Sequence, residues 1–350
     1  PYRAVLTHGF VVDAEGRKMS KSLGNVVAPS EVIDRFGAEI LRLWVTASDY
    51  REDIRISPGI LKQLSDAYRR IRNTSRFVLG NLYDFDPQTD AVAYETMLEI
   101  DRFTLHRLQE LVERLVRAYD NYDFHIIYHR LYNFCTIDLS SFYLDVLKDR
   151  LYTAPSTSHA RRSAQTAMFH VLETLTRLMA PILVFTAEEI WQHLPGQREN
   201  GESVHQAHLP SARPEWKDEA LNERWQKILA VRAEVTRVLE KARAEKRIGH
   251  PLDAAVTLAP PPEFHEVLSR YEEELSRIFI VSKVELVTDG IPENAIAGEE
   301  INGLRIAIER APGEKCQRCW VYETTVGSFL DHPEICHRCH HALEQIGAHP

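Results

Sequence analysis

The segment LEIDRFTLHRLQELVERLVRAY, residues 98–119, carries apolar side chains at helical spacing. This stripe consists of Leu98, Leu105, Leu108, Leu111, Leu115 and Tyr119. A second stripe at the same spacing consists of Ala164, Met168, Val171, Leu175, Leu178 and Met179. Because the long segments between residues 60 and 195 all have this pattern, the sequence predicts a helical bundle there. Thr186 and Glu189 have the spacing of a capping box, which predicts a helix start at Thr186.

The segments on either side of the bundle have other patterns. Residues 1–12 are predicted to be extended, and residues 222–248 form one long predicted helix. After residue 251, three short strand patterns (254–258, 284–287 and 304–308) and one helical pattern (264–275) predict a small α/β unit. We therefore expect a mainly α chain with four domains, at residues 1–57, 58–210, 211–309 and 310–350.

Composition and charge narrow the class of protein. The 350 residues are 44% hydrophobic and 27% charged, which is typical of globular domains and excludes disordered and fibrous classes. The longest apolar run is too short to span a bilayer, so we expect a soluble protein. The first residue is Pro1 rather than methionine, so we expect the chain to be a piece of a longer one.

The net charge is −9, which argues against a protein that coats nucleic acid indiscriminately. Two segments are nevertheless basic: residues 58–80 and residues 222–249 each carry a net charge of about +4, counted from the sequence. Such faces suit contacts to nucleic-acid phosphates. The candidate residues on the first of them are Arg69, Arg70, Arg72 and Arg76.

Four of the five cysteines form the pattern C-x2-C-x16-C-x2-C, through Cys316, Cys319, Cys336 and Cys339. This spacing predicts one Zn²⁺ ion held by four thiolates, and it disfavours disulfides, an iron–sulfur centre or redox chemistry. A closed set of four protein ligands leaves no open position, so the metal is expected to be structural. Nearby histidines could replace a thiolate, but we expect them on the solvated surface: His332, His337, His340 and His341.

Two further residues are the fifth cysteine and the tryptophan of the four-cysteine segment. Cys135 lies among aromatic and aliphatic residues and is expected in the core. Trp320 follows the first cysteine pair and could stack on a base or cover the metal site. Residues 310–350 are slightly acidic, and four thiolates with one divalent ion add further negative charge. Electrostatic attraction is therefore a poor account of any phosphate binding by this tail.

The loop KMSKSLGN, from Lys18 to Asn25, has two lysines three residues apart. With Gly16 and Gly24 as possible hinges, their ammonium groups could close over a polyphosphate and stabilise charge on a departing pyrophosphate. A solvated lysine loop without such a role explains the charge pattern equally well.

The stretch HGFVVDAEGRKMSKSLGNVVAPSEVIDRFGAEILRLWVTASDY, residues 8–50, resembles the end of the catalytic domain of class I aminoacyl-tRNA synthetases. Residues 68–77, 132–145 and 179–191, with the four-cysteine segment and Trp320, are similar to bacterial-type isoleucyl-tRNA synthetases. The resemblance covers essentially the whole chain. It implies the end of a Rossmann-type catalytic domain at 1–57, an anticodon-binding bundle at 58–210, a junction domain at 211–309 and a zinc module at 310–350.

The resemblance also implies an activity and its residues. Lys21 would bind ATP, used with Mg²⁺, and stabilise the transition state of adenylate formation; Lys18 would assist, and Ser20 and Ser22 would hold the loop. Isoleucine and tRNA-Ile would be the other substrates, the zinc tail would also meet tRNA, and the protein would be a cytoplasmic monomer.

Part of the family pattern is not in this sequence. The His-Ile-Gly-His signature and the amino-acid pocket of the family precede such a loop, so we expect this chain alone not to form aminoacyl-adenylate. Two alternatives remain. A valine or leucine ligase shares the lysine loop but leaves the four-cysteine module unexplained, and a non-catalytic tRNA-binding zinc protein would have kept the body without the active site.

Overall fold

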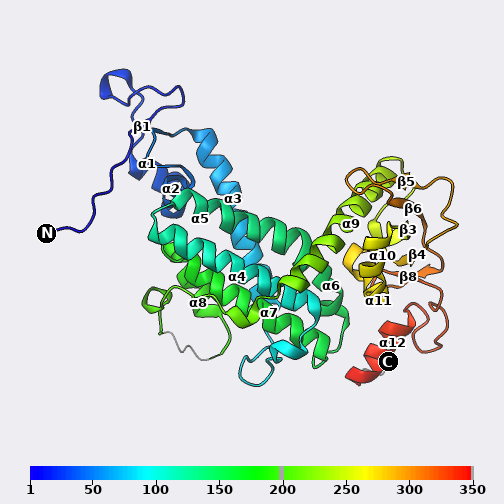
Figure 1. Cartoon of the computed structure of the whole chain (residues 1–350). Helices are drawn as coiled ribbons and strands as arrows, with labels where there is room; N and C mark the ends of the chain where they lie inside the picture. The colour runs from blue at the N-terminus through cyan, green and yellow to red at the C-terminus, as the bar shows by residue number, and fades with distance from the viewer. Residues whose placement is uncertain (197–200, 348–350) are drawn as a thin grey trace. The chain divides into compact units, whose positions relative to one another are not determined.

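The computed structural model describes residues 1–196 and 201–347 (Figure 1). These residues form two compact units, the first from Pro1–Asp145 and Gln165–Lys217, the second from Val146–Ala164 and Asp218–Pro350. The four domain boundaries expected from the sequence stay a prediction. Within the described ranges, no helix is both long enough and apolar enough to cross a membrane.

The first unit is mainly helical (Figure 1). Its helices are α1 (Pro29–Phe36), α2 (Ala38–Ala47), α3 (Pro58–Gly80), α4 (Glu99–Asp120), α5 (Phe124–Asn133), α8 (Val184–His193) and the larger part of α7 (His159–Met179). The first apolar stripe lies on α4, where Leu105, Leu108 and Leu115 are completely buried. Every residue of the second stripe is also buried, on α7. The predicted bundle is therefore confirmed, with the second stripe and most of the first in its core, while Leu98 and Tyr119 are half-buried.

A π-helical segment, η3 (Phe134–Tyr143), connects α5 to α6 (Leu144–Thr153). Its wider turn leaves backbone groups without their usual α-helical partners. The hydroxyl of Thr74 on α3 lies 3.4 Å from the carbonyl oxygen of Cys135 and 2.9 Å from the hydroxyl of Ser140. Cys135 is completely buried, as expected, and burial raises the pKa of its thiol to about 12.

The predicted capping box at Thr186 is wrong. Helix α8 begins two residues earlier, at Val184, and no side chain of its own N-cap residue closes it. The carboxylate of Glu39 on α2 does so instead, accepting hydrogen bonds from the backbone N–H of Phe185 (2.8 Å) and of Thr186 (3.2 Å), and from the Thr186 hydroxyl. A carboxylate at this end of a helix also complements the helix dipole. The cap thus comes from a residue distant in sequence.

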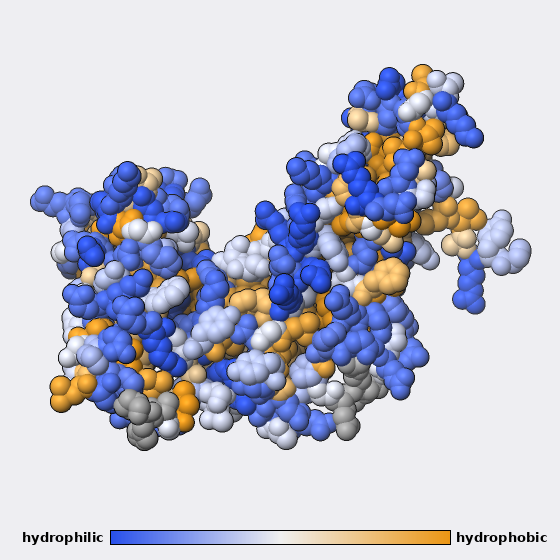
Figure 2. All heavy atoms as spheres, turned by 180° about the vertical axis from the view of Figure 1, so that it is seen from behind, coloured by the Kyte–Doolittle hydropathy of each residue, from blue (hydrophilic) through white to orange (hydrophobic). Residues whose placement is uncertain are grey.

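Residues 1–12 form less strand than expected. Only β1 (Val11–Val12) is a strand, and it pairs in parallel with β2 (Ile54–Arg55). The segment before β1 exposes large apolar side chains, which are Tyr2, Val5, Leu6 and Phe10. Figure 2 shows hydrophobic spheres at this N-terminal end, while most of the visible face is hydrophilic. The parallel pairing fixes the position of the loop that follows β1.

The second unit contains α9 (Glu219–Ala244) and a four-stranded sheet in the order β4-β3-β6-β5. The strands are β3 (Ala254–Ala259), β4 (Lys283–Leu286), β5 (Ile296–Ala297) and β6 (Arg305–Arg310). Strand β3 is parallel to β4 and antiparallel to β6. The single helix predicted between β3 and β4 is instead two, α10 (Pro262–Ser269) and α11 (Glu272–Phe279), and the α/β character is confirmed. The chain continues into a hairpin, β7 (Glu314–Lys315) and β8 (Tyr322–Glu323), and then α12 (His337–Ile346).

Candidate functional site

The lysine loop follows β1 and contains a short 3-10 turn, η1 (Lys21–Leu23). The turn is closed at its start by the Ser20 hydroxyl, which accepts a hydrogen bond from the backbone N–H of Leu23 (3.3 Å). It ends at Gly24, whose φ of 67° lies in the left-handed region that glycine adopts without strain. The hydroxyls of Ser20 and Ser22 lie 3.1 Å apart. Both predicted serines thus belong to the turn that carries Lys21.

The ammonium groups of Lys18 and Lys21 are exposed. Across residues 1–196 and 201–347, neither forms an ion pair with a carboxylate. Two exposed cations three residues apart in one loop, without carboxylate partners among the described residues, are available to an anionic ligand. Both side chains are equally open to solvent.

Two residues to which the sequence analysis assigned no role in the site hold this loop. Asp13, only 7% exposed, accepts hydrogen bonds at Oδ1 from the backbone N–H groups of Glu15 (3.1 Å) and Arg17 (2.8 Å). At Oδ2 it accepts from Arg17 Nε (2.8 Å) and from Asn25 Nδ2 (2.9 Å). The hydrogen bond from Asn25 is the main cause that lowers the pKa of Asp13 to about 2, with Arg17 contributing further, so the carboxylate stays ionised at neutral pH.

The four predicted zinc ligands come together in the second unit. The sulfur atoms of Cys316, Cys319, Cys336 and Cys339 all lie within 4.8 Å of one another. The Cys319 and Cys336 sulfurs are 3.7 Å apart, close to the roughly 3.8 Å edge of a tetrahedron with zinc–sulfur bonds of about 2.3 Å. None of the five cysteines forms a disulfide. Four soft sulfur donors in this arrangement fit one Zn²⁺ ion.

Each cysteine pair has its own local scaffold. Cys316 follows β7, and its carbonyl accepts a hydrogen bond from the backbone N–H of Trp320 (2.8 Å), which closes the first turn. Cys336 precedes the first residue of α12, so Cys339 lies in the first turn of that helix. The Cys336 N–H also donates to the Cys316 sulfur (3.3 Å), a contact that stabilises a thiolate. Ile335 packs against the sulfurs from the apolar side.

The side chains around the metal site bear on one question that the sequence left open and on one expectation. Trp320 is 57% exposed, with φ at 67°, and the Lys315 ammonium lies 5.4 Å from its ring centre. This indole is therefore largely open to solvent. His340 is not the solvated residue that was expected: its side chain is 13% exposed, stacks on Phe329 at 4.1 Å and lies 3.0 Å from an Asp331 carboxylate oxygen.

The predicted basic face on α3 is exposed. Its residues are Arg69, Arg70, Arg72 and Arg76. Arg69 pairs with Asp66 (2.7 Å) and Arg72 with Glu189 (3.7 Å), so part of the positive charge is compensated. Arg70 and Arg76 have no carboxylate partner within the residues that the structure describes. These two are the more available cations of this face.

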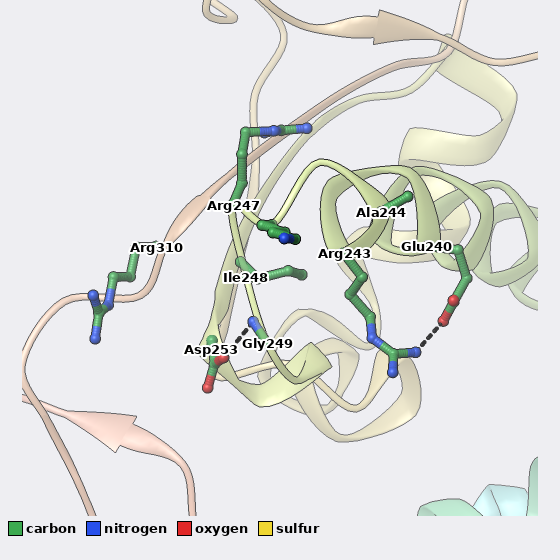
Figure 3. Close-up of a pocket in the computed structure, with 9 residues that line it drawn as sticks. Glu240, Arg243, Ala244, Arg247, Ile248, Gly249, Asp253 and Arg310 are labelled. Carbon is green, nitrogen blue, oxygen red and sulfur yellow. Dashed lines mark hydrogen bonds and ion pairs between the residues drawn. The ribbon is translucent and has the colours of Figure 1, made fainter.

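The second basic segment ends in a cavity of about 690 Å³ in the second unit (Figure 3). Four cations line it, from the end of α9 and from β6: Arg243, Lys246, Arg247 and Arg310. Arg243 pairs with Glu240 (2.7 Å) and Arg247 with Glu245 (2.9 Å). Figure 3 shows Arg310 on a separate backbone segment from Arg243 and Arg247. The sequence indicated the basic helix but not the contribution of β6.

Lys246 in this cavity has an unusual backbone. Its φ is 59°, in the left-handed region where a helix C-terminus normally places glycine. The Arg247 N–H donates to the Ala242 carbonyl (2.9 Å), so the residue ends α9 in the way that a terminal glycine would. No carboxylate pairs with Lys246 or Arg310 in the described part of the chain. These two are the cations of the cavity that could bind an anion.

Three family models match separate parts of the chain. Residues 1–57 match the model of class I tRNA synthetases for I, L, M and V, residues 101–258 match the anticodon-binding domain of tRNA ligase, and residues 313–342 match the zinc finger found in FPG and IleRS. The chain is 56% identical to an isoleucine–tRNA ligase of Geobacter sulfurreducens over 344 residues, 98% of this chain and 37% of that protein.

A second isoleucine–tRNA ligase, from Syntrophotalea carbinolica, is 56% identical over 340 residues, 97% of this chain and 36% of that protein. Among solved structures, the ternary complex LeuRS-tRNA-LeuAMS of Agrobacterium radiobacter K84 matches with a TM-score of 0.48 at 20% identity, covering 60% of this chain and 24% of that one. The chain spans little more than a third of the length of the curated relatives. It belongs to the isoleucine–tRNA ligase family and corresponds to a C-terminal portion of such a ligase.

Proposed function

We propose that this chain supplies the lysine loop, the tRNA-binding helical body and the zinc-stabilised tail of an ATP-dependent isoleucine–tRNA ligase. The complete enzyme would join isoleucine to ATP, release pyrophosphate, and transfer the aminoacyl group from the adenylate to tRNA-Ile. The observation that carries the proposal is the lysine loop, in which a capped turn presents Lys21 three residues after Lys18 and neither lysine pairs with a carboxylate among the described residues, in a chain similar to isoleucine–tRNA ligases over nearly its whole length.

In the first step, negative charge develops on the departing pyrophosphate of ATP, which would be bound with Mg²⁺. The ammonium of Lys21, assisted by Lys18, would stabilise that charge in the transition state. Ser20 and Ser22 would hold the turn, because the Ser20 hydroxyl caps it and the Ser22 hydroxyl lies next to it. An oxygen of the isoleucine carboxylate would form a bond to the α-phosphorus of ATP while the bond from that phosphorus to the departing pyrophosphate breaks. This exchange needs the amino-acid pocket, for which this chain supplies no proposed residue.

The proposed partner of the helical body is tRNA-Ile. Support comes from the anticodon-binding match at residues 101–258 and from the exposed cations Arg70 and Arg76 on α3. In the second unit, Lys246 and Arg310 would bind backbone phosphates at the cavity. Trp320 is exposed enough to stack on a base.

The zinc ion would act on the structure of the tail and not on the reaction. Four cysteine thiolates fill a tetrahedral shell, and when bound the ion would join the β7–β8 hairpin to α12. Cys316 and Cys319 would hold it from the hairpin, and Cys336 and Cys339 from the start of the helix. A cytoplasmic location, where ATP and free tRNA are available to such a ligase, is part of the proposal, and so is a monomeric state.

Charging assays on the complete ligase test the amino-acid assignment. Isoleucine, valine and leucine would each be offered with the matching tRNA, and we expect charging of tRNA-Ile with isoleucine to dominate. The match of residues 313–342 to a zinc finger found in FPG and IleRS supports isoleucine over the other two. Preferential charging with valine or leucine would overturn the assignment, and a complete protein that charges none of the three would favour the non-catalytic alternative.

A further inference from the structure

The side chain of Asn25 joins three points of the lysine loop. Its Oδ1 accepts a hydrogen bond from the Ser20 backbone N–H (2.8 Å), and its Nδ2 donates to the Lys18 carbonyl (3.3 Å) and to Asp13 Oδ2 (2.9 Å). The first two contacts lie on either side of residue 19, between the two lysines. Asn25 therefore fixes the backbone at both ends of the segment that separates Lys18 from the turn carrying Lys21.

The chemistry of the partners dictates the orientation of this amide. A backbone N–H can only donate, so it must face the amide oxygen. A carboxylate and a carbonyl can only accept, so they must face the amide nitrogen. Asparagine satisfies all three partners at once, whereas aspartate of the same size would place a second carboxylate against Asp13 and would lack both donors.

Asp13 in turn is held independently of the loop that it anchors. It directly follows β1, which pairs in parallel with β2, and the Ile56 N–H donates to the Val12 carbonyl (3.0 Å). Its own turn is closed by the Asp13 N–H bond to the Arg17 carbonyl (3.0 Å). The contact from Asn25 to Asp13 therefore connects the lysine loop to a strand of the first unit.

We propose that Asn25, anchored on Asp13, is a positioning residue that holds Lys18 and Lys21 in the arrangement required for adenylate formation. The inference rests on the proposed function, because it concerns the same loop. Asn25 would not touch ATP; it would act through the backbone that carries the two lysines. Preorganised charges cost no rearrangement when the pyrophosphate leaves, so loss of Asn25 should lower the rate of the step more than it weakens substrate binding.

The first test measures the order of the loop without any substrate. Trypsin cleaves after Lys18 and Lys21 only when the backbone opens locally. In Asn25→Ala we expect cleavage at these sites to be about tenfold to a hundredfold faster, because each lost hydrogen bond changes such an equilibrium by up to about an order of magnitude. Asp34→Ala is the matched control, since Asp34 is an exposed residue on α1, outside this network. Equal cleavage rates in the two variants would overturn the proposal.

The second test uses pyrophosphate exchange into ATP by the complete ligase, with four variants: Asn25→Ala, Asn25→Asp, Asp34→Ala and Lys21→Ala. For Asn25→Ala we expect kcat to fall about tenfold to a hundredfold, with KM for isoleucine unchanged and KM for ATP changed by less than about threefold. Asn25→Asp should be at least as impaired, although it conserves size, and Asp34→Ala should behave as wild type.

These outcomes separate the inference from the proposed function. If Lys21→Ala loses exchange while Asn25→Ala and Asn25→Asp keep it, the positioning role is wrong and the role of the lysine stands. If Lys21→Ala keeps full exchange, the proposed function of the loop is itself wrong, and the inference falls with it. Wild-type kcat in Asn25→Asp alone would show that the size of the side chain matters and its hydrogen bonds do not, which also overturns the proposal.

Discussion

Arg338, between the cysteines of the second zinc-binding pair, forms a two-point ion pair with Asp149 on α6: its Nη2 lies 2.7 Å from Oδ1, and its Nη1 pairs with Oδ2. Arg318 occupies the same place between the cysteines of the first pair, and its Nη1 donates to the carbonyl of Thr153, the last residue of α6 (2.6 Å). Both arginines thus bind the second half of one helix, and Arg318 does so at its C-terminus, where a cation also complements the helix dipole. The folded metal site and α6 are therefore directly connected.

Replacing Cys316 by serine should release the metal and disorder residues 313–346, because a closed thiolate site contributes its binding energy to local folding. The buried stripes of α4 and α7 do not depend on these sulfurs, so the helical bundle should stay folded. Zinc content would be measured together with hydrogen exchange. Protection should be lost in the tail and at the end of α6 but kept in α4. A variant that retains a full equivalent of zinc would show that the ligand set is wrong.

Arg338→Ala should keep the zinc and lose the contact to α6. The pair is partly exposed, with 43% of the Arg338 side chain accessible, so we expect a loss of only about 1 kcal/mol in local stability. Hydrogen exchange at residues 149–153 should become about fivefold faster. Gln317→Ala is the control, because Gln317 is an exposed residue of the first cysteine pair that does not bind α6 through its side chain. Unchanged exchange in Arg338→Ala would mean that the contact does not hold the helix.

In the complete ligase, Lys21→Ala should depress adenylate formation by about a hundredfold while leaving tRNA affinity nearly unchanged. The reason is that Lys21 would contact charge on the pyrophosphate, which develops only in the first step. Pyrophosphate exchange and tRNA binding would be measured on the same preparation. Comparable losses in both would assign the lysine to general stability or to tRNA binding instead.

Lys246→Ala and Arg310→Ala test the cavity at the end of α9. If each cation contacts one phosphate, each substitution should weaken tRNA binding and reduce the slope of log affinity against log salt by about one. Lys283→Ala is the control, because Lys283 already pairs with Glu285 (3.0 Å) on β4. A salt slope equal to that of the wild type in both cavity variants would remove this site from the proposed tRNA face.

The sequence predicted those features that depend on local spacing. Helical stripes such as that through Leu105 and Leu108 place side chains on one face whatever the rest of the chain does. Each C-x2-C pair likewise predicts a tight turn from its local spacing alone. In contrast, the cap of α8 by Glu39 joins residues 147 positions apart, which no local pattern can reveal.

Two features were visible in the sequence only in part: the hydrogen-bond network of the lysine loop and the arginines of the zinc site. The residues could be seen there, but their partners could not. Asn25 was visible as the last residue of the loop motif, but its role depends on Asp13 being fixed by the pairing of β1 with β2. Arg318 and Arg338 have identical positions in the two cysteine pairs, which the sequence shows. Their common target on α6 required the structure, because 165 residues separate Arg318 from Thr153.

The stability of the first unit should depend on pH through His170 on α7. Its ring lies 4.8 Å from that of Trp216, and the guanidinium of Arg213 lies 4.3 Å from the same indole. Burial, with a smaller contribution from Arg213, lowers the pKa of His170 to about 4. The unfolded chain, with a histidine pKa of about 6.5, therefore takes up a proton first as the pH falls. This contribution to stability is complete above pH 6.5 and is lost between about pH 6.5 and pH 4.

Urea unfolding at several pH values measures the effect. Between pH 7 and pH 4 we expect the free energy of unfolding to fall by up to about 3 kcal/mol through this group. His170→Gln should remove that part of the slope, because glutamine does not titrate. His208→Gln, a change at an exposed histidine of the same unit, should keep it, and the carboxylates that titrate below pH 5 contribute equally to both variants. Identical slopes for the two variants would show that folding does not lower the pKa of His170.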